Sequence, residues 1–217
     1  MNEENPIRLI EELALHAWPA EVTEQLDGWQ IRWHPMTSRR VNSVWPNAWG
    51  GDIPLGMKLN KVEMYYGLRG QPARYQICPA AIPAGLDDVL EARGYSVDAV
   101  TAVQVAEIVD VMDRSAHTFL EGKIKMFETL EEEWLEGYCR IKAHLPINVP
   151  FRRVALGRVR QPSIYVCVNV DGQATAVGRG WSNAVGWGCL ACPPISIFEE
   201  EDWRPQCFKA WQNGEKK

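Results

Sequence analysis

The stretch that decides the fold is Ala176 to Pro194, AVGRGWSNAVGWGCLACPP. Just before it, Asp171-Gly172 separates two runs rich in β-forming residues, Ser163–Val170 and Ala174–Trp181. Such a dipeptide between two such runs is typical of a two-residue β-hairpin. The second run continues through Val185–Ala191. The stretch therefore predicts two strands of an antiparallel sheet in the last part of the chain.

Outward from this stretch, hydrophobic periodicity predicts alternating helices and strands. In the second half we expect a strand at Lys123–Phe127 and helices at Leu130–His144 and Phe151–Arg160. In the first half the expected elements are a helix at Pro6–Trp18, a strand at Trp29–Trp33, a helix at Leu59–Leu68, a strand at Ala73–Cys78, a helix at Asp87–Arg93, a strand or strand pair at Val97–Met112 and a linker at Arg114–Gly122. The predicted class is α/β (α+β), with mixed sheets flanked by helices in two small halves, the second unfinished.

The composition is that of an ordinary globular protein, with 217 residues of which 46% are hydrophobic and 24% charged. A net charge of −5 gives no basic footprint for nucleic acid, and no apolar run reaches the length of a membrane span. The acidic start, MNEENPIRLIEEL, does not resemble a signal peptide, and six scattered cysteines favour reduced thiols. We expect a cytoplasmic protein that binds neither nucleic acid nor membranes; its oligomeric state is left open.

Several motifs, taken in order, resemble the GNAT-type N-acetyltransferases, in particular the two-lobed bacterial type. The resembling motifs are Ala17-Trp18-Pro19, Gly28-Trp29-Gln30-Ile31-Arg32, Arg39-Arg40-Val41-Asn42-Ser43-Val44-Trp45-Pro46, Val62-Glu63 with Tyr65-Tyr66, Gly70-Gln71-Pro72-Ala73-Arg74-Tyr75-Gln76, Leu90 to Gly94-Tyr95, and Asp171-Gly172 through Ala176-Val177-Gly178-Arg179-Gly180 to Gly186-Trp187. The resemblance covers residues 8 to about 188. It implies a degenerate N-terminal lobe at residues 1–113, the start of an acetyl-CoA-binding lobe at 114–188, and an aberrant tail at 189–217.

The function that the resemblance implies is transfer of an acetyl group from acetyl-CoA, as co-substrate, to an amine on a small molecule or peptide. The strand beside acetyl-CoA would include Gly186, Trp187 and Gly188. The catalytic residues are unknown; Glu63 and Tyr65 are candidates for a general base by residue type alone. Whether the chain is active as written is left open.

The tail departs from the family where the resemblance implies a pyrophosphate-binding loop of the form Arg/Gln-x-x-Gly-x-Gly/Ala at the start of a helix. In such a loop the backbone amides and the helix dipole hold the phosphates. This chain instead has the acidic run Glu199–Asp202, followed by Pro205. Acids repel a pyrophosphate and proline lacks an N–H donor. We therefore expect acetyl-CoA binding to be weak or absent.

A single-base frameshift from about residue 188 onward, in the gene or in its sequencing, would account for this departure. Codons built from the last base of each codon and the first two of the next permit Arg-Arg-Arg-Gly-Leu-Ala across Phe198 to Arg204. That reading fits the missing loop at the expected place. It requires a Phe198 codon ending in C, a Glu201 codon ending in G, and no stop in the shifted frame.

A second candidate site lies in the first half, where Arg39, Arg40 and Asn42 follow one another closely. Arginine suits bidentate contact with carboxylate or phosphate, so these residues are candidates for an anion or substrate pocket. The alternative is a solvated loop whose Asn and Ser side chains cap local backbone groups.

The remaining groups of cysteine, acidic and histidine residues give weaker signals for a functional site. Cys189 and Cys192 have the spacing of a redox pair or half a zinc site, but a zinc site needs four ligands and only Cys207 lies nearby. The acidic run Glu199–Asp202 lacks the loop geometry of a cation site. The four histidines lie far apart, with no nucleophile motif. We predict no metal.

Two readings outside the enzyme class remain open. The chain is a non-catalytic binding or structural module if the first lobe keeps its fold without chemistry. It is a non-functional remnant if the unfinished second lobe leaves strand edges unpaired, because such edges invite aggregation.

Overall fold

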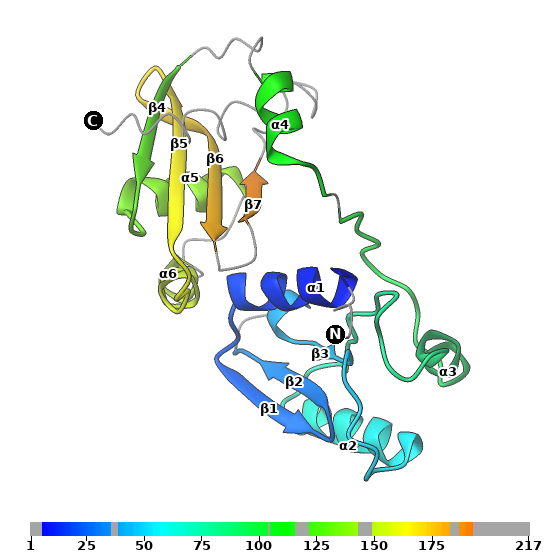
Figure 1. Ribbon diagram of the computed structural model, residues 1–217. Helices are drawn as coiled ribbons and strands as arrows, with labels where there is room; N and C mark the ends of the chain where they lie inside the picture. Colours follow the sequence, from blue (N-terminus) through cyan, green and yellow to red (C-terminus); the bar gives the residue numbers. More distant parts are fainter. Residues whose placement is uncertain are drawn as a thin grey trace. The chain divides into compact units, whose positions relative to one another are not determined.

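A computed structural model describes residues 6–35, 39–103, 105–115, 122–142, 149–182 and 187–192, the last six by their backbone alone. The chain divides into two compact units, Met1–Thr101 and Ala102–Lys217, whose elements are drawn in Figure 1. The α+β class predicted from the sequence is confirmed, since each unit combines a sheet with helices. The lobes at 1–113 and 114–188 stay a prediction.

The first unit is built on a small sheet in the order β1-β2-β3, from β1 (Val22–Leu26), β2 (Trp29–Trp33) and β3 (Val44–Trp45). These strands pair antiparallel. The turn between β1 and β2 has positive φ angles of 46° at Asp27 and 90° at Gly28, which match the twist of a tight hairpin. The predicted strand Ala73–Cys78 is wrong in extent, because only Tyr75 forms a bridge, parallel to Val44.

The helices of the first unit are α1 (Pro6–Ala17), α2 (Leu55–Gly67) and α3 (Leu86–Ala92), with a 3-10 turn, η1, at Arg39–Val41. In Figure 1, α1 and α2 lie on opposite sides of the sheet. The α2 side holds the main core, formed by Trp29, Ile31, Val44, Leu59, Val62, Tyr66, Leu86 and Leu90. Alternation along β2 places Ile31 in this core and its neighbour Arg32 on the α1 side.

Arg32 fixes α1 to the sheet although its side chain is buried. Its Nη1 donates to the carbonyl of Arg40 at 3.0 Å, and its Nη2 to the carbonyls of Leu15, at 3.5 Å, and Trp18. Burial lowers the pKa of Arg32 to about 10, so the guanidinium stays charged at neutral pH. The charge is held by carbonyl oxygens at the end of α1.

The second unit contains α4 (Ile108–Ser115), β4 (Lys123–Phe127), α5 (Glu132–Ile141), α6 (Val149–Gly157), β5 (Ser163–Val170), β6 (Gln173–Ser182) and β7 (Trp187–Cys192). Its four strands are antiparallel neighbours in chain order, as Figure 1 shows. The predicted hairpin at Asp171-Gly172 is confirmed. The prediction that the second strand of this hairpin continues through Val185–Ala191 is wrong. Strand β6 ends at Ser182, and β7 is a separate strand that pairs antiparallel with it.

The predicted strand or strand pair at Val97–Met112 is also wrong. Residues 97–103 lie outside any strand, and α4 begins at Ile108. Val97, Val100, Val103 and Val105 are all exposed. β-Branched residues favour a strand only where neighbouring strands pack against them, and among the described residues no strand pairs with this segment. The predicted linker Arg114–Gly122 begins inside α4, and residues 116–121 lie outside the described residues.

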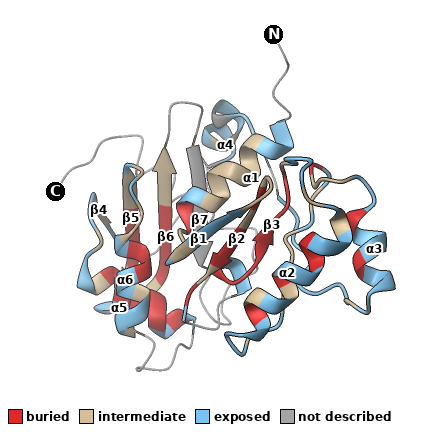
Figure 2. Ribbon diagram, turned by 90° about the horizontal axis from the view of Figure 1, so that it is seen from below, coloured by how far each residue is buried: buried red, intermediate tan, exposed pale blue. Residues whose placement is uncertain are grey.

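Helix α5 packs directly on the sheet of the second unit, and buried residues line α5, β5 and β6 in Figure 2. A Cβ atom added to Gly137 would lie 2.8 Å from Cβ of Ala174 and 3.3 Å from Cγ1 of Val177. Glycine therefore permits the close approach of helix and strand. Trp134, three residues earlier, is fully buried, and its Nε1 donates to the carbonyl of Gly178 on β6.

Replacing Gly137 with valine is expected to lower the free energy of unfolding by about 1–3 kcal/mol, because the added atoms overlap the sheet. The matched control is Gly157→Ala at the end of α6, where an added Cβ meets nothing within 4 Å. The control is expected to be as stable as the wild type or slightly more stable. Urea unfolding measures both, and equal stability of the two variants would contradict the close packing.

Candidate functional site

The strand predicted to lie beside acetyl-CoA is β7. Trp187 and Gly188 are its first residues and pair with Ser182 and Trp181 of β6, whereas Gly186 lies outside the described residues. β7 is the last strand of the sheet, so among the described residues its second edge has no neighbouring strand. Such an edge presents backbone N–H and C=O groups with which an extended ligand can pair. The coenzyme role of these residues stays a prediction.

Aromatic side chains lie against β6, the strand with which β7 pairs. Nε1 of Trp134 on α5 donates a buried hydrogen bond to the carbonyl of Gly178 at 2.9 Å. The Trp134 ring stacks on Tyr138, with centroids 5.2 Å apart, and meets Tyr165 edge-on at 5.0 Å. The buried guanidinium of Arg179 lies 5.2 Å from the Trp181 ring centroid. The segment of β6 that pairs with β7 is therefore held by contacts from α5.

The first-half candidates Arg39, Arg40 and Asn42 do not share one surface. Arg39 is exposed and forms an ion pair with Asp98, whose pKa the Arg39 guanidinium lowers. Arg40 is exposed too. Asn42 is fully buried, and its Oδ1 accepts the backbone N–H of His34 at 2.8 Å. Asn42 therefore caps a local backbone group, as the alternative interpretation of this segment proposed. The substrate role of the three residues stays a prediction.

Neither Glu63 nor Tyr65, the two candidates for a general base, has surroundings typical of a general base. The carboxylate of Glu63 accepts from Arg93 at 2.8 and 3.1 Å and from the Tyr95 hydroxyl at 3.2 Å, which joins α2 to the segment after α3. Burial, followed by the charge of Glu24, raises the pKa of Tyr65. Its hydroxyl therefore stays protonated at neutral pH and does not accept a proton.

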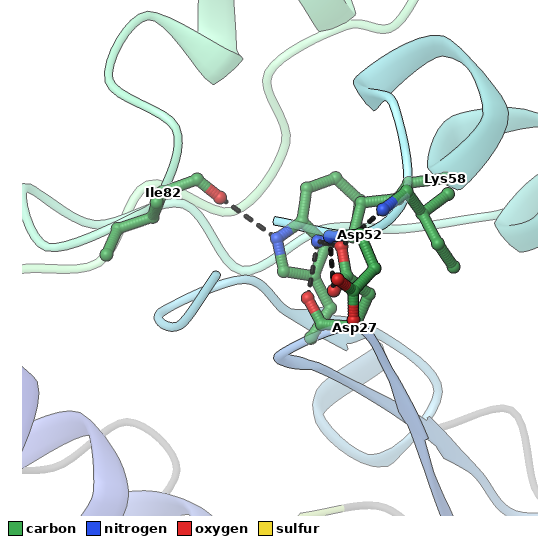
Figure 3. A network of polar contacts seen from close by, with 6 residues as sticks. Asp27, Asp52, Lys58 and Ile82 are labelled. Atoms are coloured by element: carbon green, nitrogen blue, oxygen red, sulfur yellow. Dashed lines mark hydrogen bonds and ion pairs between the residues drawn. The ribbon is translucent and has the colours of Figure 1, made fainter. Parts of the chain in front are cut away.

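A buried polar network that the sequence did not reveal surrounds Asp27 (Figure 3). Its Oδ1 and Oδ2 accept the backbone N–H groups of Asp52 and Ile53, each at 3.2 Å. The fully buried ammonium of Lys58 lies 3.0 Å from Oδ2 and donates to the Asp27 carbonyl at 2.5 Å. It also lies 3.6 Å from the Trp49 ring centroid, within range of a cation–π interaction.

The network holds the loop before α2 in one conformation. Burial alone would raise the pKa of Asp27, but the hydrogen bonds from Lys58, Asp52 and Ile53, with the Lys58 charge, lower it below its ordinary value. A Cβ atom on Gly50 would overlap the Asp27 side chain at 1.9 Å. The carboxylate therefore fills the space in front of the first turn of α2, where a helix favours negative charge.

Metal ligation and membrane insertion have no support in the described parts of the chain. No group of three or more His, Cys, Asp or Glu side chains is arranged there to hold a metal ion. No helix there has both the length and the apolar character needed to cross a membrane. The side chains of Cys189 and Cys192, and all of Glu199–Asp202 and Cys207, lie outside the described residues.

The α+β fold of the described residues, with α5 and α6 between β4 and β5 in the chain, is consistent with a GNAT-like fold. Among curated proteins, the chain is similar to an uncharacterized N-acetyltransferase, YobR, of Bacillus subtilis (strain 168), with 30% identity over 144 residues. The alignment covers 64% of this chain and 55% of that protein, so the chain spans about half the length of this relative. No family model and no solved structure matches the chain.

Proposed function

We propose that the chain derives from a GNAT-type enzyme that moves an acetyl group from acetyl-CoA to an amine. The observation that carries the proposal is the 30% identity to a protein named as an N-acetyltransferase. The sheet of the second unit supports it, because its last strand, β7, has one edge without a neighbouring strand among the described residues. The acceptor is a small molecule or peptide that carries a primary amine.

In this proposal the open edge of β7 pairs with the extended pantetheine and aligns the thioester. Trp187 and Gly188 lie at the start of that edge. A neutral amine attacks the thioester carbonyl, a C–N bond forms and the C–S bond breaks. The nitrogen gives up one proton to solvent, and coenzyme A leaves as a thiolate that takes up one proton from solvent. Backbone N–H groups stabilise the developing oxyanion. No residue of the first unit is assigned to the proton transfer, since Glu63 is bound to Arg93 and Tyr65 has a raised pKa.

The finer part of the proposal concerns the tail. The sequence after β7 contains four consecutive acids where the resemblance implies amides that hold the pyrophosphate. We infer that residues from about 188 onward are the product of a single-base frameshift, in the gene or in its sequencing. Sequencing the gene through the codons of Trp187 to Lys217, and past the stop, tests this inference. A stop codon within the shifted frame would contradict it.

The chain as written is expected to bind acetyl-CoA with a Kd above the micromolar range. Its sequence lacks the loop whose backbone amides, together with a helix dipole, would bind the phosphates. Titration calorimetry with acetyl-CoA measures this, and coenzyme A thiol release in the presence of an amine panel measures turnover. Micromolar affinity would show that the tail as written does not impair the enzyme.

A further inference from the structure

Helix α2 has a second apolar side, which does not face the core of the first unit. Its core side carries Leu59, Val62 and Tyr66. The other side carries an outer stripe of four residues, Met57, Lys61, Met64 and Leu68. With 3.6 residues per turn, the centres of the two sets lie roughly 160° apart around the helix axis. Figure 2 shows both buried and exposed residues along α2, so the helix is apolar on two opposite sides.

The apolar side chains of the outer stripe are well exposed. Met57 is 54% exposed, Met64 62% and Leu68 80%. Leu68 is the C-cap of α2 but keeps helical dihedral angles, φ −62° and ψ −20°, and its N–H donates to the carbonyl of Met64 at 3.0 Å. The stripe is therefore continuous along the helix. Apolar side chains gathered in one patch, and methionines above all, are typical of interaction surfaces.

The spacing of the outer stripe is that of a coiled-coil seam. Steps of four, three and four residues give Met57 and Met64 the d positions of a heptad repeat, and Lys61 and Leu68 the a positions. The spacing is the same when it is read in reverse. In an antiparallel pair of α2 helices, Met57 of one copy therefore meets Leu68 of the other, and Lys61 meets Met64. A second copy of the same helix fits this stripe.

The residues beside the outer stripe permit such a pair. On one side lie the uncharged Asn60 and Gly67, and a Cβ added to Gly67 meets nothing within 4 Å, so a second helix has room there. On the other side, Lys58 is fully buried and adds no charge to the seam. The aliphatic stem of Lys61 can cover Met64 of the partner while its ammonium reaches water. Antiparallel helices also bring opposite ends of their dipoles together.

The size of the outer stripe limits the strength of the contact. A stable protein–protein interface uses about 20–30 residues on each partner, whereas the stripe offers four residues and their neighbours. Each copy would bury three exposed apolar side chains, and this burial is the driving force. The area therefore suits a weak, reversible dimer and not an obligate one.

We propose that the outer stripe of α2 is the surface through which two copies of this chain form a weak antiparallel dimer. Met57, Met64 and Leu68 of each copy pack against the stripe of the other. Lys61 selects the antiparallel register at a cost in affinity, as a single lysine at an a position does. The surface lies in the first unit, and the proposal is independent of the acetyl transfer proposed for the second.

The test is sedimentation equilibrium of the full chain from about 5 µM to about 1 mM, a range that brackets a weak Kd. We expect the average mass to rise from the 24.6 kDa of one chain toward twice that value, with a Kd on the order of 100 µM. A mass that stays at that of the monomer at every concentration overturns the proposal.

Two substitutions in the outer stripe are expected to move the affinity in opposite directions. Met57→Glu places a carboxylate against Leu68 of the partner and weakens the dimer at least about tenfold; an acid in the first turn suits the helix dipole, so α2 is kept. Lys61→Leu completes the apolar seam and tightens the dimer at least about tenfold. The double variant is expected to lose that gain, which separates the seam from unspecific adhesion. Unchanged dimerisation in either single variant overturns the proposal.

Val154→Glu on α6 is the matched control. Val154 is 51% exposed, close to the 54% of Met57, and the substitution adds the same charge outside the outer stripe. We expect this variant to dimerise as the wild type does. Near-ultraviolet circular dichroism of the tryptophans checks that each variant is folded. Equal weakening by Val154→Glu and Met57→Glu overturns the assignment of the contact to α2.

Discussion

Replacing Lys58 with methionine is expected to lower the free energy of unfolding by about 3–5 kcal/mol. The Lys58 ammonium is fully buried and lies 3.0 Å from Oδ2 of Asp27. Methionine retains most of the side-chain volume but removes the charge. The Asp27 carboxylate then keeps only the amide hydrogen bonds from Asp52 and Ile53, and a buried charge without its counter-ion is strongly destabilising. Urea unfolding at neutral pH measures the loss.

The double variant Lys58→Met with Asp27→Asn separates charge from packing. It is expected to recover part of the lost stability, because no buried charge remains. In the wild type the lowered pKa of Asp27 gives a stabilisation that is present above the ordinary carboxyl pKa and is lost as the pH falls through the lowered value. Lys58→Met lacks this contribution, so its deficit is largest near neutral pH and shrinks in acid. A deficit that is equally large in the double variant, or the same at every pH, would contradict the electrostatic explanation.

Elements whose apolar residues recur regularly and form one buried face were predictable from the sequence. Trp29–Trp33, Lys123–Phe127 and Ser163–Val170 are strands with the predicted bounds, because alternating apolar residues fit one buried face of a sheet. The edge strand β1 was missed, since the middle of Val22–Leu26 is polar and exposed. Pairing with β2 holds that strand, and pairing partners are not visible in the strand's own sequence.

The failure at Val97–Met112 has a different cause. Valine content indicated a strand, but propensity acts only where a sheet is available for packing. Val100 is 89% exposed and Val105 77% exposed, so these side chains have no such environment in the described structure. The acids and the apolar spacing from Ile108 onward instead form α4.

The polar sites show most clearly what a sequence alone cannot reveal. Asp27 precedes a glycine, as turn residues often do, and lysine side chains are rarely fully buried, yet Asp27 and Lys58 meet across 31 positions of the chain. Conversely, Arg39 and Asn42 are near neighbours in sequence, but one is exposed and the other fully buried.

A protein translated in the shifted frame from about Gly188 onward is expected to bind acetyl-CoA at least about 100-fold more tightly than the chain as written. The permitted reading Arg-Arg-Arg-Gly-Leu-Ala replaces the acids Glu199–Asp202 with a loop whose amides and arginines hydrogen-bond the pyrophosphate. Two hydrogen bonds to a charged group already suffice for a factor of about 100. Titration calorimetry on the two proteins side by side measures the difference.

The matched control keeps the frame as written and carries Glu199→Gln, Glu200→Gln, Glu201→Gln and Asp202→Asn. These changes remove the repulsion of the phosphates without creating the loop, so the control is expected to recover only a small part of the affinity. If the neutral tail binds as tightly as the shifted-frame protein, charge repulsion alone explains the weak binding and the loop is not needed. If the shifted-frame protein binds no better than the chain as written, the acetyltransferase proposal fails at its coenzyme. A non-catalytic module, carried by the first unit and its buried Asp27–Lys58 pair, would then be the better interpretation.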